Sequence, residues 1–411
     1  MNRKQFGILL ILLVILGGAG LLLRKNHERA ANEGEQGTGQ KLLGDNFPIN
    51  DVTELDIKHG TNELVLFKKD DMWRVRERSD YPANFSQISD FLIKAADLKV
   101  IQNEEVGPSQ LARLELEPGT GTNSGVIVDL KNKDGKSIKT LALGKKHINK
   151  SARPPSQFSM GGDNMSDGRY VFVGGNTHNA LLIADPLNNL EAKPDVWVSK
   201  DFFKIERPKA IAVTFPAATN SWKIVRDTET GDWNFSDAKG DEKLDQARAS
   251  GVSSPFSSPS FTDVLPANTQ PQPAGLDKPT VVTVDTFDDL TYTVKVGSKT
   301  NDDYPITVTV AANFPKQRVP AKDEKPEDKA KADTAWAKRQ SDLEARVKQT
   351  KEFENWIYLI PSWTVEPVLK DRKDLVAEKK EETKKEDSTD SQPVIEKHEE
   401  GLVPPEKPDA K

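Results

Sequence analysis

The chain has 411 residues, which is the length of two or three ordinary domains. Because only 36% of the residues are hydrophobic and 30% are charged, we do not expect a single large core. Its formal net charge of −6 argues against a general nucleic-acid-binding protein, which usually carries a basic domain. The absence of cysteine excludes disulfides, thiolate nucleophiles, cysteine-ligated zinc and lipid attachment to cysteine. It also fits a protein outside the cytoplasm, although cytosolic proteins can lack cysteine too.

Residues 6–23 (FGILLILLVILGGAGLLL) form an apolar segment without a charge, just long enough to cross a bilayer as a helix. We expect a signal-anchor that leaves residues 1–5 in the cytoplasm and the bulk of the chain outside it. The alternative is a cleaved signal peptide with Gly18-Ala19-Gly20 as its cleavage site, but the apolar run continues beyond that site, which favours retention. Residues 24–44 are polar and glycine-rich, which predicts a flexible stalk.

A first α+β module is predicted over residues 45–205. Apolar alternation between residues 52 and 75 predicts short antiparallel strands that close on Trp73. Asn84 is then expected to cap a helix, because it stands directly before a segment with one apolar face. A hairpin with a turn at Asp134-Gly135 follows, and the module continues with two more strands.

A second, related module is predicted over residues 206–365, because three features of the first return in the same order. Trp233 follows Trp73 by 160 residues, a strand from Val281 follows one from Val126 by 155, and Gly297 follows Gly144 by 153. This near-constant spacing favours a duplication, the alternative being that small α+β domains share hairpins. Residues 253–273 are rich in proline and serine, so the helix of the first module is expected to be lost here.

A charged helix is predicted inside the second module, within an insertion of about residues 316–353. Trp336, Leu343 and Val347 form a narrow apolar stripe on it, and its charged faces exclude it from a core. We expect the stripe to pack on its own module, with a partner surface as the alternative. Residues 366–411 are rich in lysine and glutamate and predict a disordered tail.

Sequence motifs for catalysis or cofactor binding are absent. The chain has no dinucleotide-binding glycine pattern, no phosphate-binding loop, no GxSxG and no HExxH, and no two of its five histidines lie three or four residues apart. Residues 163–168 (DNMSDG) resemble a calcium loop at Asp163, Asp167 and Gly168, but Met165 stands where an oxygen ligand is needed, so we interpret them as a polar loop. We therefore predict no catalytic, cofactor-binding or metal-binding residues, and no cofactor.

Three charged groups are candidate sites, and we interpret all three as structural. Residues 76–80 (RERSD) could line a polar groove, but exposed strand and loop charges are the usual case. The carboxylate pairs Asp288-Asp289 and Asp302-Asp303 both lie beside turns. Adjacent residues on a strand point to opposite faces, which is poor geometry for a catalytic pair.

Several segments of the first module resemble the uncharacterised bacterial family known as domain of unknown function 4340. These segments are YPANF, LIKAADLKV, VGPSQLARLELEPG, LALGKKH and GRYVFV, between residues 81 and 173, and the strand pair that ends at Trp73. The resemblance covers residues 45–205 well and the second module loosely. It implies a membrane-anchored extracytoplasmic protein similar to auxiliary components of ABC-type export or gliding-motility systems. It supplies no active site.

The sequence thus predicts an α+β protein with an N-terminal transmembrane helix, two related antiparallel-sheet-plus-helix modules and a charged tail. Its expected role is that of a non-catalytic binding or assembly protein, single-pass in the bacterial inner membrane and exposed to the periplasm. The expected partners are the bilayer, through residues 6–23, and a membrane protein such as an ABC-type transporter, with no nucleic acid. The alternatives are an enzyme acting on an envelope polymer and a structural spacer.

Overall fold

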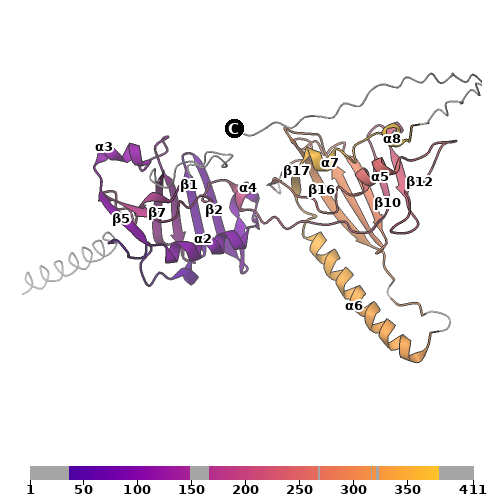
Figure 1. The fold of residues 1–411 in the computed structure, drawn as a ribbon, viewed down its shortest axis with the longest axis horizontal. Helices are drawn as coiled ribbons and strands as arrows, with labels where there is room; N and C mark the ends of the chain where they lie inside the picture. Colours follow the sequence, from indigo (N-terminus) through magenta and orange to yellow (C-terminus); the bar gives the residue numbers. More distant parts are fainter. Residues whose placement is uncertain (1–36, 149–165, 267–268, 316, 321–323, 379–411) are drawn as a thin grey trace, which may run out of the picture. The chain divides into compact units, whose positions relative to one another are not determined.

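Two antiparallel sheets organise the chain (Figure 1), and the described residues through Val376 group into one unit. The computed structural model describes residues 37–148, 166–266, 269–315, 317–320 and 324–378. The predicted transmembrane helix at residues 6–23 lies outside these ranges. Among the described residues, no helix is both long enough and apolar enough to cross a membrane.

The first sheet has nine strands among the described residues, in the order β4-β3-β2-β1-β6-β7-β8-β9-β5. Its strands are β1 (Glu54–His59), β2 (Asn62–Lys69), β3 (Met72–Val75), β4 (Tyr81–Pro82), β5 (Val100–Glu105), β6 (Val126–Lys131), β7 (Ser137–His147), β8 (Gly168–Val173) and β9 (Asn179–Ile183). Helix α2 (Phe85–Asp97) lies across one face of this sheet (Figure 1). Its buried side chains Ile88, Phe91, Leu92 and Ala95 join the main core.

The second sheet has eight strands among the described residues, in the order β12-β11-β10-β14-β15-β16-β17-β13. Its strands are β10 (Pro208–Thr214), β11 (Trp222–Val225), β12 (Asn234–Phe235), β13 (Asp263–Leu265), β14 (Thr280–Thr286), β15 (Leu290–Val296), β16 (Asp303–Ala312) and β17 (Ile357–Pro361). The other α-helices are α3 (Pro108–Leu111), α4 (Pro194–Trp197), α5 (Gln246–Ser253), α6 (Pro326–Lys351), α7 (Ser362–Val365) and α8 (Arg372–Leu375). Four short 3-10 helices are η1 (Ile49–Asp51), η2 (Arg76–Arg78), η3 (Ala112–Leu114) and η4 (Ala218–Asn220).

The two sheets share one strand order apart from β4, which has no counterpart. In the first sheet β1 lies between β2 and β6, and in the second sheet β10 lies between β11 and β14. The strands that follow the helix of each module, β5 and β13, lie at the far edge of their sheets. The registers agree too, because Leu55 lies opposite Leu66 in the first sheet and Ile211 lies opposite Ile224 at the same place in the second. The repeat that the spacing predicts is therefore present in the topology.

The later hairpin of each module corrects one detail of that repeat. In the first module Val126 pairs with Leu143, the residue before Gly144. In the second module Thr280 pairs with Val296, the residue before Gly297. Thr280, not Val281, is thus the counterpart of Val126. One extra residue in the sequence alignment is enough to place a side chain on the wrong face of a strand.

The equivalent glycines have one packing role in both modules. A Cβ on Gly144 would lie 2.3 Å from the carbonyl oxygen of Leu114, and a Cβ on Gly297 would lie 2.5 Å from that of Ala274. In each module the backbone of the segment before the hairpin therefore lies close to this glycine, near the end of the second hairpin strand. Only a residue without a side chain leaves room for that backbone.

Both modules have a helix at the same place, which corrects the expectation that the second module lacks one. The side chain of Asn84 accepts a hydrogen bond from the amide of Gln87 (3.2 Å), and that of Asp245 accepts one from the amide of Arg248 (3.0 Å). These are the N-caps of α2 and α5, so the cap predicted at Asn84 is confirmed. Helix α5 ends at Ser253, where the proline- and serine-rich stretch begins.

Two segments expected to be flexible pack on the modules instead. In the predicted stalk, the amide of Leu42 donates to the carbonyl of Leu98 (2.7 Å), and Leu42 is fully buried. In the predicted tail, Leu375 is fully buried, and the indole of Trp222 donates to the carbonyl of Lys370 (2.8 Å). The expectation was therefore wrong for residues 37–44 and 366–376, where a few leucines anchor otherwise polar segments. Residues 24–36 and 379–411 lie outside the described ranges.

Helix α6 is inserted between β16 and β17, as expected, and extends beyond the sheet (Figure 1). Its C-terminal half packs on the second module through Leu343, which is 7% exposed, and through Thr350. Leu343 belongs to the main core, which corrects the expectation that no part of this helix does. Val347 packs against that core as a partly buried residue.

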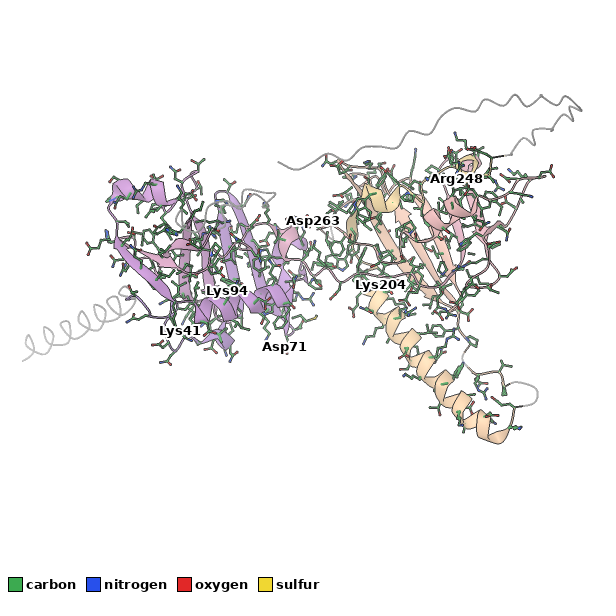
Figure 2. The ribbon with its side chains drawn as sticks, viewed as in Figure 1. Lys41, Asp71, Lys94, Lys204, Arg248 and Asp263 are labelled. Carbon is green, nitrogen blue, oxygen red and sulfur yellow. The ribbon has the colours of Figure 1, made fainter. Side chains whose placement is uncertain are left out.

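Side-chain contacts also join the two modules within the unit, at and beside the edge strands β4 and β13. The guanidinium of Arg78 donates to both carboxylate oxygens of Asp263, labelled in Figure 2, at 2.8 and 2.6 Å. The ring centroid of Tyr81 lies 5.0 Å from that of Trp356 and 6.2 Å from that of Phe261, and both ring pairs are edge-on. Edge-on aromatic pairs are favourable beyond the area they bury.

Candidate ligand-binding cavity

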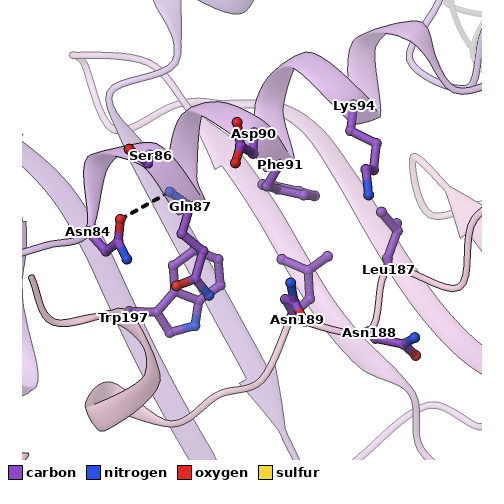
Figure 3. A pocket seen from close by; sticks show the side chains of 11 residues that line it. Asn84, Ser86, Gln87, Asp90, Phe91, Lys94, Leu187, Asn188, Asn189 and Trp197 are labelled. Atoms are coloured by element: carbon purple, nitrogen blue, oxygen red, sulfur yellow. Dashed lines mark hydrogen bonds between the residues drawn. The ribbon is translucent and has the colours of Figure 1, made fainter. Parts of the chain in front are cut away.

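A cavity of about 310 Å³ lies beside the first turns of helix α2 (Figure 3). The helix forms one wall, and the segment of residues 187–190 forms the opposite wall. Trp197, at the end of α4, closes it from below in this view. Residues that are about 100 positions apart in the sequence therefore meet here.

The loop that forms the opposite wall is held in a strained conformation. Leu187 has a φ of 47°, in the left-handed region that bulky residues rarely adopt. Its amide donates to the side chain of Asp185 (2.7 Å), which also forms an ion pair with Lys94 of α2 (3.0 Å). Arg169 donates to the carbonyls of Pro186 and Leu187 (3.2 and 3.4 Å). These contacts fix the loop in spite of the strain, a feature that is frequent at binding sites.

The chemistry of the cavity is mostly that of side-chain amides. These come from Asn84 and Gln87 on the helix and from Asn188 and Asn189 on the loop (Figure 3). Each amide can both donate and accept hydrogen bonds without carrying a charge. The amide oxygen of Asn84 accepts the helix-cap hydrogen bond, which leaves its amide nitrogen as the group that can donate to a ligand.

The apolar part of the lining consists of Phe91, Leu187, Leu190 and Trp197. Trp197 is fully buried, and its indole donates to the carbonyl of Glu191 (2.9 Å), so it supports the floor of the cavity. Among the described lining residues the ionisable groups are Asp90 and Lys94. The arrangement suits a neutral ligand with both donors and acceptors, such as an extended peptide segment.

The charged groups singled out in the sequence have structural partners. The backbone N–H of Val65 donates one bifurcated hydrogen bond to the two carboxylate oxygens of Glu77 (both 3.1 Å). The carboxylate of Asp80 pairs with Lys69 (3.0 Å), and that of Asp303 accepts from Thr262 (2.8 Å). Glu77, Asp80 and Asp303 therefore each bind a neighbouring group of the fold.

The other two candidate groups are the Asp288-Asp289 pair and the calcium-like loop of residues 163–168. Asp288 is buried and bonded to arginines, while its neighbour Asp289 lies exposed in a turn. Asp167 bonds the imidazole of His147 (2.8 Å), and Asp163 and Met165 lie outside the described ranges. Within the described residues, no three His, Asp or Glu side chains gather in a way that could hold a metal ion.

A family model, domain of unknown function (DUF4340), matches residues 73–279. The match begins at Trp73, ends before β14 and covers half of the chain. The chain belongs to this family. No curated protein and no solved structure matches it.

The DUF4340 match contains every residue that lines the amide-rich cavity. Sequence reasoning missed this site, because amides carry no catalytic signature. One local signal was present. The Asn188-Asn189 pair is flanked by two leucines in a segment between a strand and a helix, where an ordinary turn would not need leucines on both sides.

Proposed function

We propose that this DUF4340 protein is a non-catalytic binding or assembly component of a membrane complex, such as an ABC-type transporter. In this proposal residues 6–23 anchor the chain in the bacterial inner membrane, and the two modules stand in the periplasm. The amide-lined cavity beside α2 receives an extended peptide segment of the partner. The length and apolar character of residues 6–23 support the anchor.

The lining of the cavity is the observation that carries the binding role. Four amides on opposite walls can pair with the alternating N–H and C=O groups of a peptide backbone. The apolar floor, which includes Phe91, can accept one side chain of that peptide. The strained Leu187 is held by several contacts, so the wall is already formed before a ligand arrives.

Site-specific photo-crosslinking in the living bacterium tests the proposal. A photoreactive amino acid at Gln87 is expected to form adducts with a transporter-type membrane protein, since this side chain lines the cavity. The same amino acid at Gln102, which is exposed on β5 outside the cavity, is the matched control and is expected to form none. Asn188→Ala with Asn189→Ala should remove the adducts at Gln87.

Several outcomes would contradict the proposal. Equal adducts from Gln87 and Gln102 would show that the cavity is not the contact. Turnover of an envelope polymer by the purified chain, lost in Asp90→Asn, would make the protein an enzyme. The anchor is tested separately by alkaline carbonate extraction, after which the chain should stay in the membrane pellet. Release with a new amino terminus near Leu21 would instead show a cleaved signal peptide.

A further inference from the structure

A second cavity, also of about 310 Å³, lies at one end of the first sheet. Its walls come from the end of β1, the start of β6, the end of β7 and the start of β8, which meet because neighbouring strands are antiparallel. The segment of residues 188–193 closes it. This cavity shares Asn188 and Leu190 with the amide-lined one but differs from it in chemistry.

Positive charge exceeds negative charge in this second cavity. Its lining contains Lys146, Arg169, Lys193 and the imidazole of His59, against a single carboxylate, that of Glu191. Glu191 is already paired with Lys193 (2.7 Å). Among the described residues, no carboxylate forms an ion pair with Lys146 or Arg169. Within the part of the chain that the structure describes, two cationic side chains of one small cavity therefore lack a carboxylate in ion-pair contact.

Arg169 is the unusual member of this group, because it is only 8% exposed. Its hydrogen bonds go to backbone carbonyls: its Nε donates to Gly144 (2.7 Å), its Nη1 to Pro186 and Leu187 (3.2 and 3.4 Å), and its Nη2 to Leu143 (3.4 Å). Carbonyl dipoles orient a guanidinium but do not cancel its charge. Burial lowers the pKa of Arg169, and the charge of Glu115 offsets only part of that effect, so the charged form of Arg169 is poorly solvated. A bound anion would compensate that charge.

The geometry favours one class of anion. A carboxylate is normally bound by two parallel N–H groups of an arginine, but Nε and Nη1 of Arg169 already face carbonyls. The remaining donors, on Lys146, Lys193 and His59, are point donors on different walls. A tetrahedral oxyanion can accept hydrogen bonds from several directions. We infer that this cavity binds a phosphate group, either free phosphate or the phosphodiester of a lipid headgroup.

A purely structural role explains Arg169 in part. It ties the end of β7 to the loop of residues 186–187, and its replacement could disturb the fold. It does not explain Lys146, which is exposed and contributes charge to the cavity without a described carboxylate partner. Lys146 is therefore the residue to change. Its neighbour Lys145 is also exposed and does not line the cavity, which makes it a matched control.

The test is isothermal titration of the purified full-length chain with inorganic phosphate, and separately with glycerophosphoglycerol, the soluble headgroup of an anionic lipid. Ionic strength is held constant with chloride so that screening does not change. Lys146→Gln should weaken binding by about tenfold, as expected for loss of one charge-assisted hydrogen bond. Lys145→Gln should leave it unchanged. Thermal unfolding of both variants shows that they are folded.

The two ligands distinguish the sources of the phosphate. Tighter binding of inorganic phosphate identifies a soluble anion, and tighter binding of glycerophosphoglycerol identifies a lipid headgroup. Absence of heat with both ligands would overturn the inference, as would equal weakening by Lys145→Gln and Lys146→Gln. Neither result depends on the peptide partner proposed for the amide-lined cavity.

Discussion

Trp73 and Trp233 occupy equivalent positions in the two modules, although 160 residues separate them. Trp73 lies two residues before Val75, which pairs with β2. Trp233 lies two residues before Phe235, which pairs with β11, the counterpart of β2. Both indoles are buried, with exposures of 7% and 5%, and both belong to the main core. The same large side chain is therefore buried at the same position of both modules.

This equivalence predicts similar losses of stability. Trp73→Ala and Trp233→Ala should each lower the free energy of unfolding by about 3–5 kcal/mol, because each leaves a large cavity in a core. Chemical denaturation of the full-length chain measures the loss. Trp363→Ala is the control, since Trp363 is 69% exposed, and its effect should stay within about 0.5 kcal/mol. A small effect at one buried tryptophan and a large one at the other would contradict equivalent packing.

Asp288 is predicted to hold helix α6 on the second module. Its side chain is 6% exposed, pairs with Arg339 of the helix (2.8 Å), and lies 3.7 Å from Arg346. It is also hydrogen-bonded to Arg207. Asp288→Asn should lower the free energy of unfolding by about 2–3 kcal/mol, because these partly exposed arginines lose a buried counter-charge. It should also speed amide hydrogen exchange in residues 333–351.

Asp289→Asn is the matched control for this prediction. Asp289 is exposed in the same turn with a φ of 57°, a conformation that asparagine also tolerates. Its replacement should leave the exchange of α6 unchanged. If both variants exchange at the wild-type rate, Leu343 and its apolar neighbours hold the helix without the charge cluster.

Arg372 is predicted to fix the segment after β17 on the second module. Its guanidinium donates to both oxygens of the Glu242 carboxylate (3.1 and 2.7 Å) and to Asp237 (2.8 Å), and it stacks over the ring of Phe235 at 4.4 Å. Arg372→Met should lower the free energy of unfolding by about 1–3 kcal/mol, because the Glu242 carboxylate loses its partner. Lys373→Met is the control, since the Lys373 side chain is 79% exposed.

The same pair gives an acid dependence. The hydrogen bond from Arg372 lowers the pKa of Glu242 below its ordinary value of 4.5. The stability from this pair is therefore present above pH 4.5 and is lost as the pH falls through the lowered pKa. The difference between the wild type and Arg372→Met should shrink over that range. A difference that stays constant down to the acid transition would show that the loss comes from packing alone.

Tyr81 is predicted to contribute to alkaline unfolding. Burial raises its pKa to about 12 from the ordinary value of 10.0, because the ionised phenol would lose its hydration. The folded state then favours the neutral phenol, so this stability is fully present below pH 10 and is lost as the pH rises from 10 to about 12. Two pKa units correspond to about 2.7 kcal/mol at most.

Tyr81→Phe tests this by removing the titrating group and keeping the ring. Its free energy of unfolding should fall less steeply between pH 10 and pH 12 than that of the wild type. Tyr304→Phe, at a half-buried position, controls for the general effect of replacing tyrosine by phenylalanine. Equal slopes in Tyr81→Phe and the wild type would mean that the phenol of Tyr81 ionises freely in the fold.

Much of the α+β fold could be predicted because its signals are local. Alternation of apolar residues marked the strands around Trp73 and the hairpin that ends at Gly144, and Asn84 marked the start of α2. The order and spacing of the two tryptophans predicted the repeat, and helical spacing predicted the insertion that became α6. Apart from the spacing of the two tryptophans, each of these signals depends on residues within a few positions of one another.

The candidate sites and the docked segments were decided by the tertiary structure. The amide-lined cavity brings Gln87 of α2 to Asn189 of a later loop, and the basic cavity brings Lys146 and Arg169 to the end of β1. Leu42 and Leu375 lie in polar segments whose composition predicts disorder, yet the cores leave room for them. These contacts are stabilised by the burial of apolar surfaces that meet only after both sheets have formed. No local sequence pattern can therefore predict them.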